Sequence, residues 1–125
     1  MRRCGRATTK AEFTQFKREF QKWYERLGLQ DWHVLFQRGP VHDAYAEIDW
    51  DYDGMGARVT FADFIDPDGI LGYNPKLTAR HEALEFLIAP MHALAKWRHI
   101  TPDQLAVESH RLIRRLEHLL NQVGA

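Results

Sequence analysis

The chain is predicted to fold as an α+β domain with the element order helix, three-stranded antiparallel sheet, helix, helix. Apolar residues recur at helical spacing over residues 10–27, alternate with polar residues over residues 44–52, and return to helical spacing after residue 101. A length of 125 residues is enough for one hydrophobic core. We therefore expect a single domain over residues 8–125, preceded by a mobile N-terminal tail of residues 1–7.

The first predicted helix has both of its ends marked in the sequence. Thr9 and Glu12 stand at the spacing of a capping box, in which a hydroxyl and a carboxylate bind free backbone N–H groups at a helix start. Gly28 suits the position after the helix, where a left-handed conformation is common. One helical stripe of apolar, mostly aromatic residues is expected to enter the core: Phe13, Phe16, Phe20, Trp23, Tyr24 and Leu27.

Three runs typical of strands follow, at residues 32–36, 44–52 and 58–64. Apolar and polar residues alternate within the second run, as in a strand with one buried face. Asp53 and Gly54 form a strong turn signal between the second and third runs. The expected arrangement is a small antiparallel meander.

A second helix is predicted to begin at Pro75, because Asn74 can cap it and proline fits a first helical turn. Pro90 is expected to bend or end this helix, with a continuation after the kink. Its apolar face is predicted from four residues: Leu77, Leu84, Ile88 and Met91.

A long final helix is predicted after Thr101 and Gln104, which again have capping-box spacing. Its apolar residues define the face expected to be buried: Leu105, Leu112, Ile113, Leu116, Leu119, Leu120 and Val123.

Composition narrows the classes of function. The 17 basic and 17 acidic residues cancel, so no net field draws the chain to nucleic acid or to a membrane surface. No stretch approaches the roughly 20 apolar residues that cross a bilayer. The single cysteine, Cys4, excludes an internal disulfide framework. The basic start lacks the apolar core of a signal peptide, and we expect a cytoplasmic protein.

The most informative stretch is residues 81–85, HEALE, which is one residue away from the H-E-x-x-H helix motif of zinc metallopeptidases. In that motif two histidines one turn apart bind the metal, and the first glutamate takes a proton from its bound water. Here His81 and Glu82 are present, while Glu85 replaces the second histidine. A carboxylate at this spacing is still able to bind a metal ion. His81 and Glu85 are expected beside a Leu84–Ile88 core face, with Glu82 turned further toward solvent.

Four residues are candidates for a third ligand: His92, His99, Glu108 and His110. His92 shares the flank of His81, but eleven residues place it roughly 16 Å away along an unbroken helix. His99 falls in a turn, and His110 is predicted to point to water. Glu108 lies near the edge of the buried face and is the preferred ligand; the alternative is an ion pair with Arg111 or Arg115.

Three segments carry a resemblance to a known family: residues 28–34 (GLQDWHV), 80–90 (RHEALEFLIAP) and 108–117 (ESHRLIRRLE). With the element order above, the chain resembles the small SprT-related, zincin-like metallopeptidases of phages and prophages. The likeness spans nearly the whole chain, and its specificity rests mainly on residues 80–90. It implies a minimal zincin-like fold, in which a small sheet packs on the metal-bearing helix and a further helix brings the third ligand.

The resemblance also implies a ligand set. Zinc would be held by His81, the residue at position 85 and a ligand from the last helix, with Glu82 as general base. The family pattern has histidine where this chain has Glu85. A set of His81, Glu85 and Glu108 would be harder and more anionic, closer to what manganese or iron accepts.

Three functional hypotheses stay open at this point. The first is a metal-dependent hydrolase, most naturally a peptidase, in which an edge strand such as residues 57–64 aligns an extended peptide. The second is a catalytically degenerate member of the same fold that binds a protein partner without metal or cleavage, as in a phage accessory or anti-defence role. The third, nucleic-acid binding through Arg111, Arg114 and Arg115, is the weakest because the chain has no net charge.

Overall fold

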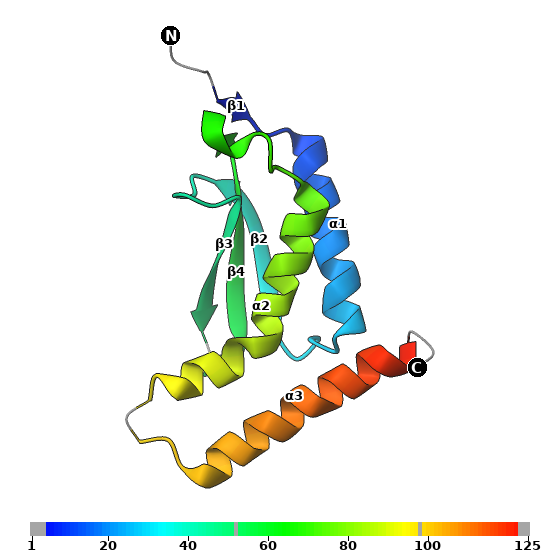
Figure 1. Ribbon diagram of the computed structural model, residues 1–125, viewed down its shortest axis with the longest axis vertical. Helices are drawn as coiled ribbons and strands as arrows, with labels where there is room; N and C mark the ends of the chain where they lie inside the picture. The colour runs from blue at the N-terminus through cyan, green and yellow to red at the C-terminus, as the bar shows by residue number, and fades with distance from the viewer. Residues whose placement is uncertain (1–4, 52, 98, 123–125) are drawn as a thin grey trace.

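The computed structural model describes residues 5–51, 53–97 and 99–122, and these residues form an α+β domain, as predicted (Figure 1). The order of elements is β1 (Arg6–Ala7), α1 (Lys10–Arg26), β2 (His33–Gly39), β3 (Ala46–Asp51), β4 (Gly56–Ala62), β5 (Phe64–Ile65), the 3-10 turn η1 (Pro67–Gly69), α2 (Pro75–Ala95) and α3 (Pro102–Gln122).

The three predicted helix starts are confirmed, because each depends on hydrogen bonds between residues close in sequence. The Thr9 hydroxyl accepts from the Glu12 N–H at 3.1 Å, and the Glu12 carboxylate accepts from the Thr9 N–H at 2.9 Å. Thr101 and Gln104 form the same reciprocal pair at the start of α3. The Asn74 side chain accepts from two backbone N–H groups in the first turn of α2.

The predicted antiparallel meander is wrong, because the main sheet is mixed. Its strand order is β2-β4-β3, with β4 in the centre, parallel to β2 and antiparallel to β3. The β3–β4 hairpin around Gly54 agrees with the turn signal. However, β2 and β3 are not neighbours. After β2 the chain crosses to the opposite edge of the sheet to form β3, and β4 then runs between β2 and β3. Alternation reports which strand face is buried and carries no information about the neighbouring strand.

A second, two-stranded sheet involves part of the expected tail. Arg6–Ala7 pair antiparallel with Phe64–Ile65, and the Arg6 guanidinium donates to both carboxylate oxygens of Glu12 at 3.0 Å. This part of the predicted tail of residues 1–7 is therefore paired to the domain, whereas residues 1–4 lie outside the described residues.

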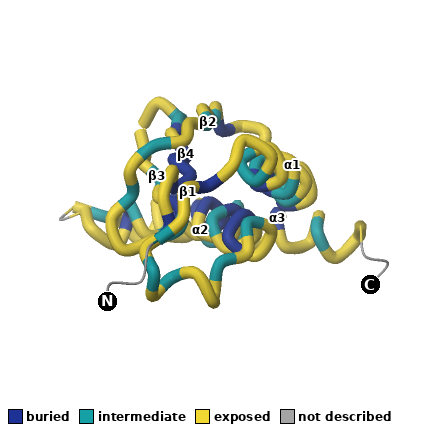
Figure 2. Tube along the Cα trace, turned by 90° about the horizontal axis from the view of Figure 1, so that it is seen from above, coloured by how far each residue is buried: buried dark blue, intermediate teal, exposed yellow. Residues whose placement is uncertain are grey.

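Helices α1 and α2 pack on each other and cover one face of the main sheet (Figure 1), and buried segments gather where helices and strands meet (Figure 2). Aromatic rings form the centre of this core. Phe16 lies 4.8 Å from Phe61 of β4, and Phe20 lies 5.4 Å from Phe86 of α2, measured between ring centroids. Both α1 residues belong to the predicted stripe, which is thus confirmed as core.

The predicted buried face of α2 is wrong. Leu77, Leu84 and Ile88 are exposed, and the core instead receives a different set of side chains: Ala79, Ala83, Phe86, Leu87, Pro90 and Leu94. Apolar residues occur on nearly every side of this helix, so their spacing does not single out one face. The helix runs continuously through Pro90, and Figure 1 shows it bending before its last turns. A proline has no N–H to donate and its ring crowds the preceding turn, which accounts for the bend.

Helix α3 crosses the ends of α1 and α2 (Figure 1), and its buried residues are Glu108 and Arg115. Of the predicted apolar face, Leu112 and Leu119 pack partly against the core, while four residues are exposed: Leu105, Ile113, Leu116 and Leu120. Val123 lies outside the described residues. Among the described helices, none has the length and apolar character needed to span a bilayer.

Candidate functional site

The His81 and Glu85 side chains lie together on α2. They are one helical turn apart, and the His81 Nε2 atom is 3.3 Å from the Glu85 Oε1 atom. Their side chains are 69% and 48% exposed, and the neighbouring Leu84 and Ile88 are exposed as well. The expected shelter at the edge of a Leu84–Ile88 core face is therefore wrong. The pair faces solvent, because the core lies on another side of the helix.

Glu82 was expected to turn toward solvent, and this expectation is also wrong. Its side chain is half-buried and lines a hollow of about 390 Å³ between α2 and the start of β3, together with Tyr45, Thr78 and His81. We call this space the Glu82 hollow. Burial, and secondarily the negative charge of Glu85, raise the pKa of the Glu82 carboxyl to about 7. A carboxyl with such a pKa is able to take up or release a proton near neutral pH.

The structure does not bring Glu108 to this pair. Glu108 is buried on α3, where its carboxylate lies 3.1 Å from the guanidinium of Arg111, as in the alternative left open by the sequence. It lines a separate hollow with Leu94 and Trp97 near the end of α2. Thirteen residues separate His81 from Leu94, which corresponds to roughly 20 Å along a straight helix.

The described residues do not complete a metal site. Among the described residues, no group of three or more His, Cys, Asp and Glu side chains is arranged to hold a metal ion. His81 and Glu85 supply two donors, whereas catalytic zinc sites take three protein ligands. The predicted convergence of His81, Glu85 and Glu108 is thus not observed, and within the part of the chain that the structure describes, zinc, manganese or iron would find only part of a ligand set.

The remaining candidates for a third ligand are dispersed. His99 is exposed, and His110 is exposed as predicted, with its Nδ1 atom 2.8 Å from the carbonyl oxygen of Ala106. His92 lies further along α2 than Glu85. It lines a further cavity, which the sequence did not predict.

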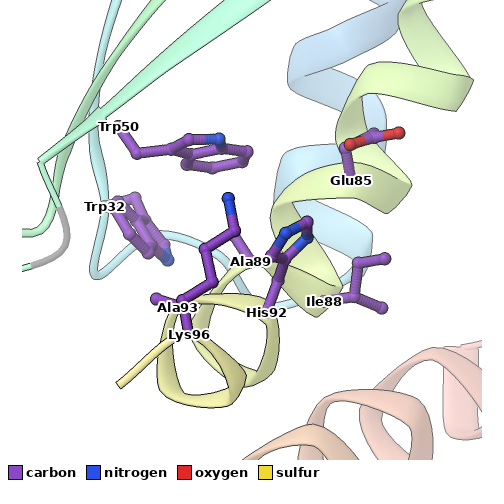
Figure 3. A pocket seen from close by; sticks show the side chains of 8 residues that line it. All are labelled: Trp32, Trp50, Glu85, Ile88, Ala89, His92, Ala93 and Lys96. Carbon is purple, nitrogen blue, oxygen red and sulfur yellow. The ribbon is translucent and has the colours of Figure 1, made fainter. Parts of the chain in front are cut away.

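This further cavity lies between α2 and the end of β3 and has a volume of about 220 Å³ (Figure 3). We call it the tryptophan pocket, and its lining residues are Trp32, Trp50, Glu85, Ile88, Ala89, His92, Ala93 and Lys96. The Trp50 ring lies 4.5 Å from the Phe86 ring and 5.8 Å from the Trp32 ring, so the aromatic wall is supported by the core. The alternation over residues 44–52 places Trp50 on the apolar face of β3. The pocket itself exists only because α2 packs against β3.

Two of the three arginines considered for nucleic-acid binding form ion pairs within the domain. Arg111 pairs with Glu108, and Arg115 is buried against Asp31 at 2.6 Å. Arg114 is exposed on α3. A basic surface that contacts phosphates needs several accessible cations, so this geometry does not favour nucleic acid.

Comparisons of the chain with models of protein families, with curated proteins and with solved structures find no match. A functional proposal rests on three features: the Glu82 hollow, the tryptophan pocket and the edge of β3 between them.

Proposed function

We propose that this protein is a peptide-binding module that takes up an extended polypeptide as an additional strand on the free edge of β3, beside α2. The proposal depends on one observation, the side of β3 to which its backbone N–H and C=O groups point. The Ala62 N–H donates to the Tyr45 carbonyl at 2.9 Å, which marks Tyr45 and Ala62 as a hydrogen-bonded pair. In an antiparallel pair such residues alternate. The backbone groups of Ala46, Ile48 and Trp50 therefore point away from β4.

The edge proposed here differs from the one expected from the sequence. The run 57–64 corresponds mainly to β4 (Gly56–Ala62), which is the central strand and is paired on both sides. Its backbone has no free edge for a peptide. β3 is an outer strand that borders α2, and an added strand there would gain backbone hydrogen bonds and bring alternate side chains to the two cavities.

The two cavities support the same ligand class. The Glu82 hollow includes Tyr45 and Ala46 at the start of β3, and the tryptophan pocket includes Trp50 near its end. Trp50 lies four positions after Ala46 on an extended strand, a span of roughly 13 Å. A peptide along β3 would thus reach both cavities with a few residues. The zincin-like resemblance of the sequence also implies a polypeptide ligand.

Metal-dependent hydrolysis is the second candidate function, and the pKa of Glu82 favours it. A carboxyl that exchanges its proton near pH 7 lies one residue after His81 and three before Glu85, as the general base of the motif would. The described residues supply only two metal donors, which is why binding without cleavage is our first proposal.

The strand-addition proposal is tested by removing one outward N–H from β3. Ile48→Pro removes that donor, and proline is tolerated in edge strands where the N–H faces solvent. Ile48→Ala is the matched control, because it shortens the same side chain and keeps the N–H. Binding of a labelled, permanently unfolded polypeptide would be measured by fluorescence anisotropy, with folding of both variants checked by circular dichroism.

We expect Ile48→Pro to weaken binding by about tenfold or more relative to Ile48→Ala. This is the expected effect of leaving one peptide acceptor without its backbone donor. Equal affinities of two folded variants would contradict strand addition. The second candidate, metal-dependent hydrolysis, is tested by measuring cleavage of the same polypeptide with zinc, manganese or iron supplied in turn. Cleavage by the wild type that Glu82→Gln reduces by about a hundredfold would establish hydrolysis.

A further inference from the structure

We propose that the tryptophan pocket binds the C-terminal residue of a peptide, with the carboxylate held by the indole N–H of Trp32 and the ammonium of Lys96 and an apolar last side chain packed against Trp50. This inference rests on the proposed peptide binding at β3 for its choice of ligand. It adds that the peptide has a free C-terminus and that this end lies at Trp50.

The first observation is an unpaired donor in the pocket wall. Trp32 is 1% exposed, and its Nε1 atom has no hydrogen-bond partner in the part of the chain that the structure describes. Buried indole N–H groups almost always have an acceptor. Figure 3 shows this nitrogen on the side of the ring that faces Lys96 and the pocket. A ligand acceptor at this place would supply the missing partner.

The second observation is a positive charge that lines the same pocket. Figure 3 shows the Lys96 side chain extending into the cavity, with its nitrogen toward the Trp50 ring. No ion pair of Lys96 is found among the described residues. The stem is exposed and flexible, so it is able to move aside and uncover the Trp32 N–H. A cation and an unpaired donor that line one small pocket together favour a carboxylate, whose two oxygens are able to accept one bond from each.

The rest of the lining specifies the ligand further. Trp50, Ile88, Ala89 and Ala93 form an apolar wall, while the Glu85 carboxylate lies across the pocket from Trp32 (Figure 3). The negative charge of Glu85 disfavours a second anionic group there, and thus an acidic last side chain. At about 220 Å³ the pocket is smaller than the roughly 300–1,000 Å³ of small-molecule sites, and it suits one apolar residue.

The position of Trp50 connects the pocket to the free edge. Its ring lines the cavity, and its backbone groups face away from β4. A chain that ends in the pocket continues from there along β3 toward Ala46. A peptide bound in this way runs parallel to β3, with its last residue beside Glu85 in the tryptophan pocket and its preceding residues toward the Glu82 hollow and His81.

The test compares one apolar-ended peptide with a free C-terminal carboxylate and the same peptide with a C-terminal amide, titrated calorimetrically against the full chain. We expect the acid to bind about tenfold or more tightly than the amide, because a charge-assisted pair is lost. Lys96→Met should weaken binding of the acid by about tenfold and leave the amide unchanged. Lys76→Met, at an exposed lysine outside the pocket, is the matched control.

Trp32→Phe tests the indole donor separately, in a variant shown to be folded by circular dichroism. It keeps an aromatic ring and removes the N–H, and we expect weaker binding of the acid. 3-Phenylpropionate, a free apolar carboxylate, is the third ligand. Binding as tight as that of the peptide would overturn the peptide assignment.

Equal affinities of acid and amide would overturn the C-terminal proposal. If Ile48→Pro still weakened binding of both peptides, strand addition at β3 would stand and only the terminal recognition would fail. If Ile48→Pro had no effect while the acid still bound through Lys96, strand addition would fail and the pocket would remain as a site for a peptide end.

Discussion

One terminal nitrogen of the Arg115 guanidinium donates to both carboxylate oxygens of Asp31, at 2.7 and 2.6 Å, and joins α3 to the loop between α1 and β2. The two partners differ in exposure, since the Arg115 side chain is 8% exposed and that of Asp31 is 45% exposed. The consequence of removing one partner therefore depends on how well water reaches the partner that remains. A lone Asp31 would be hydrated, whereas a lone Arg115 would be a buried, uncompensated charge.

Asp31→Ala is expected to destabilise the domain more than Arg115→Met. Loss of Asp31 should cost roughly 2–3 kcal/mol, below the 3–5 kcal/mol of fully buried pairs because water reaches one partner. Arg115→Met keeps an apolar stem in place and should cost about 1 kcal/mol. Urea denaturation of the two variants measures the free energies of unfolding. Equal losses, or a larger loss for Arg115→Met, would show that packing of the arginine stem outweighs its charge.

The raised pKa of Glu82 predicts a dependence of stability on pH. The folded state holds this proton more tightly than the unfolded chain, so the stabilising contribution is complete below about pH 4.5 and is lost as pH rises through about 7. Relative to Glu82→Gln, the wild type should lose on the order of 1–2 kcal/mol of unfolding free energy between pH 4.5 and pH 8, allowing for solvent screening. Glu117→Gln, at an exposed position of α3, is the control. Parallel pH profiles of wild type and Glu82→Gln would contradict the shift.

Glu85→His is expected to create a stronger zinc site. His81 and the new imidazole would stand one turn apart on an exposed helix face, where Glu85 already lies within 3.3 Å of His81. Zinc prefers such nitrogen donors in a tetrahedral set, so the affinity of Glu85→His for zinc should exceed that of the wild type by about tenfold or more. Calorimetric titration with zinc measures the change. Glu25→His, near the end of α1, controls for a single added histidine. An affinity no higher than that of this control would show that the helix face does not position the two imidazoles for one metal.

Phe86→Ala is expected to cost about 3–5 kcal/mol of stability, because a large fully buried ring is replaced by a cavity. The Phe86 ring contacts the rings of Phe20, Trp32 and Trp50, at centroid distances of 5.4, 5.6 and 4.5 Å. Leu35→Ala, on the exposed face of β2, should change stability by no more than about 0.5 kcal/mol. Thermal or urea unfolding of both variants provides the comparison. A small loss for Phe86→Ala would mean that α2 is only loosely joined to the sheet.

The sequence by itself determined the features that depend on nearby residues. The starts of α1 and α3 follow from the Thr9–Glu12 and Thr101–Gln104 pairs, whose partners are three residues apart. The contact of His81 with Glu85 follows equally from the geometry of one helical turn. The α+β class and the aromatic stripe of α1 were predictable for the same reason, because period and capping are local properties of the chain.

Only the tertiary structure decided which distant residues meet. The central position of β4, the burial of Glu82 and the separation of Glu108 from His81 all depend on contacts between elements far apart in sequence. The tryptophan pocket likewise needs Trp32, Trp50 and the bent second half of α2 to pack together. Apolar residues surround α2, so its spacing left several orientations with similar burial. In the orientation observed, Ala79, Ala83, Phe86 and Leu87 of α2 enter the core formed with α1 and the sheet, where close packing is favourable.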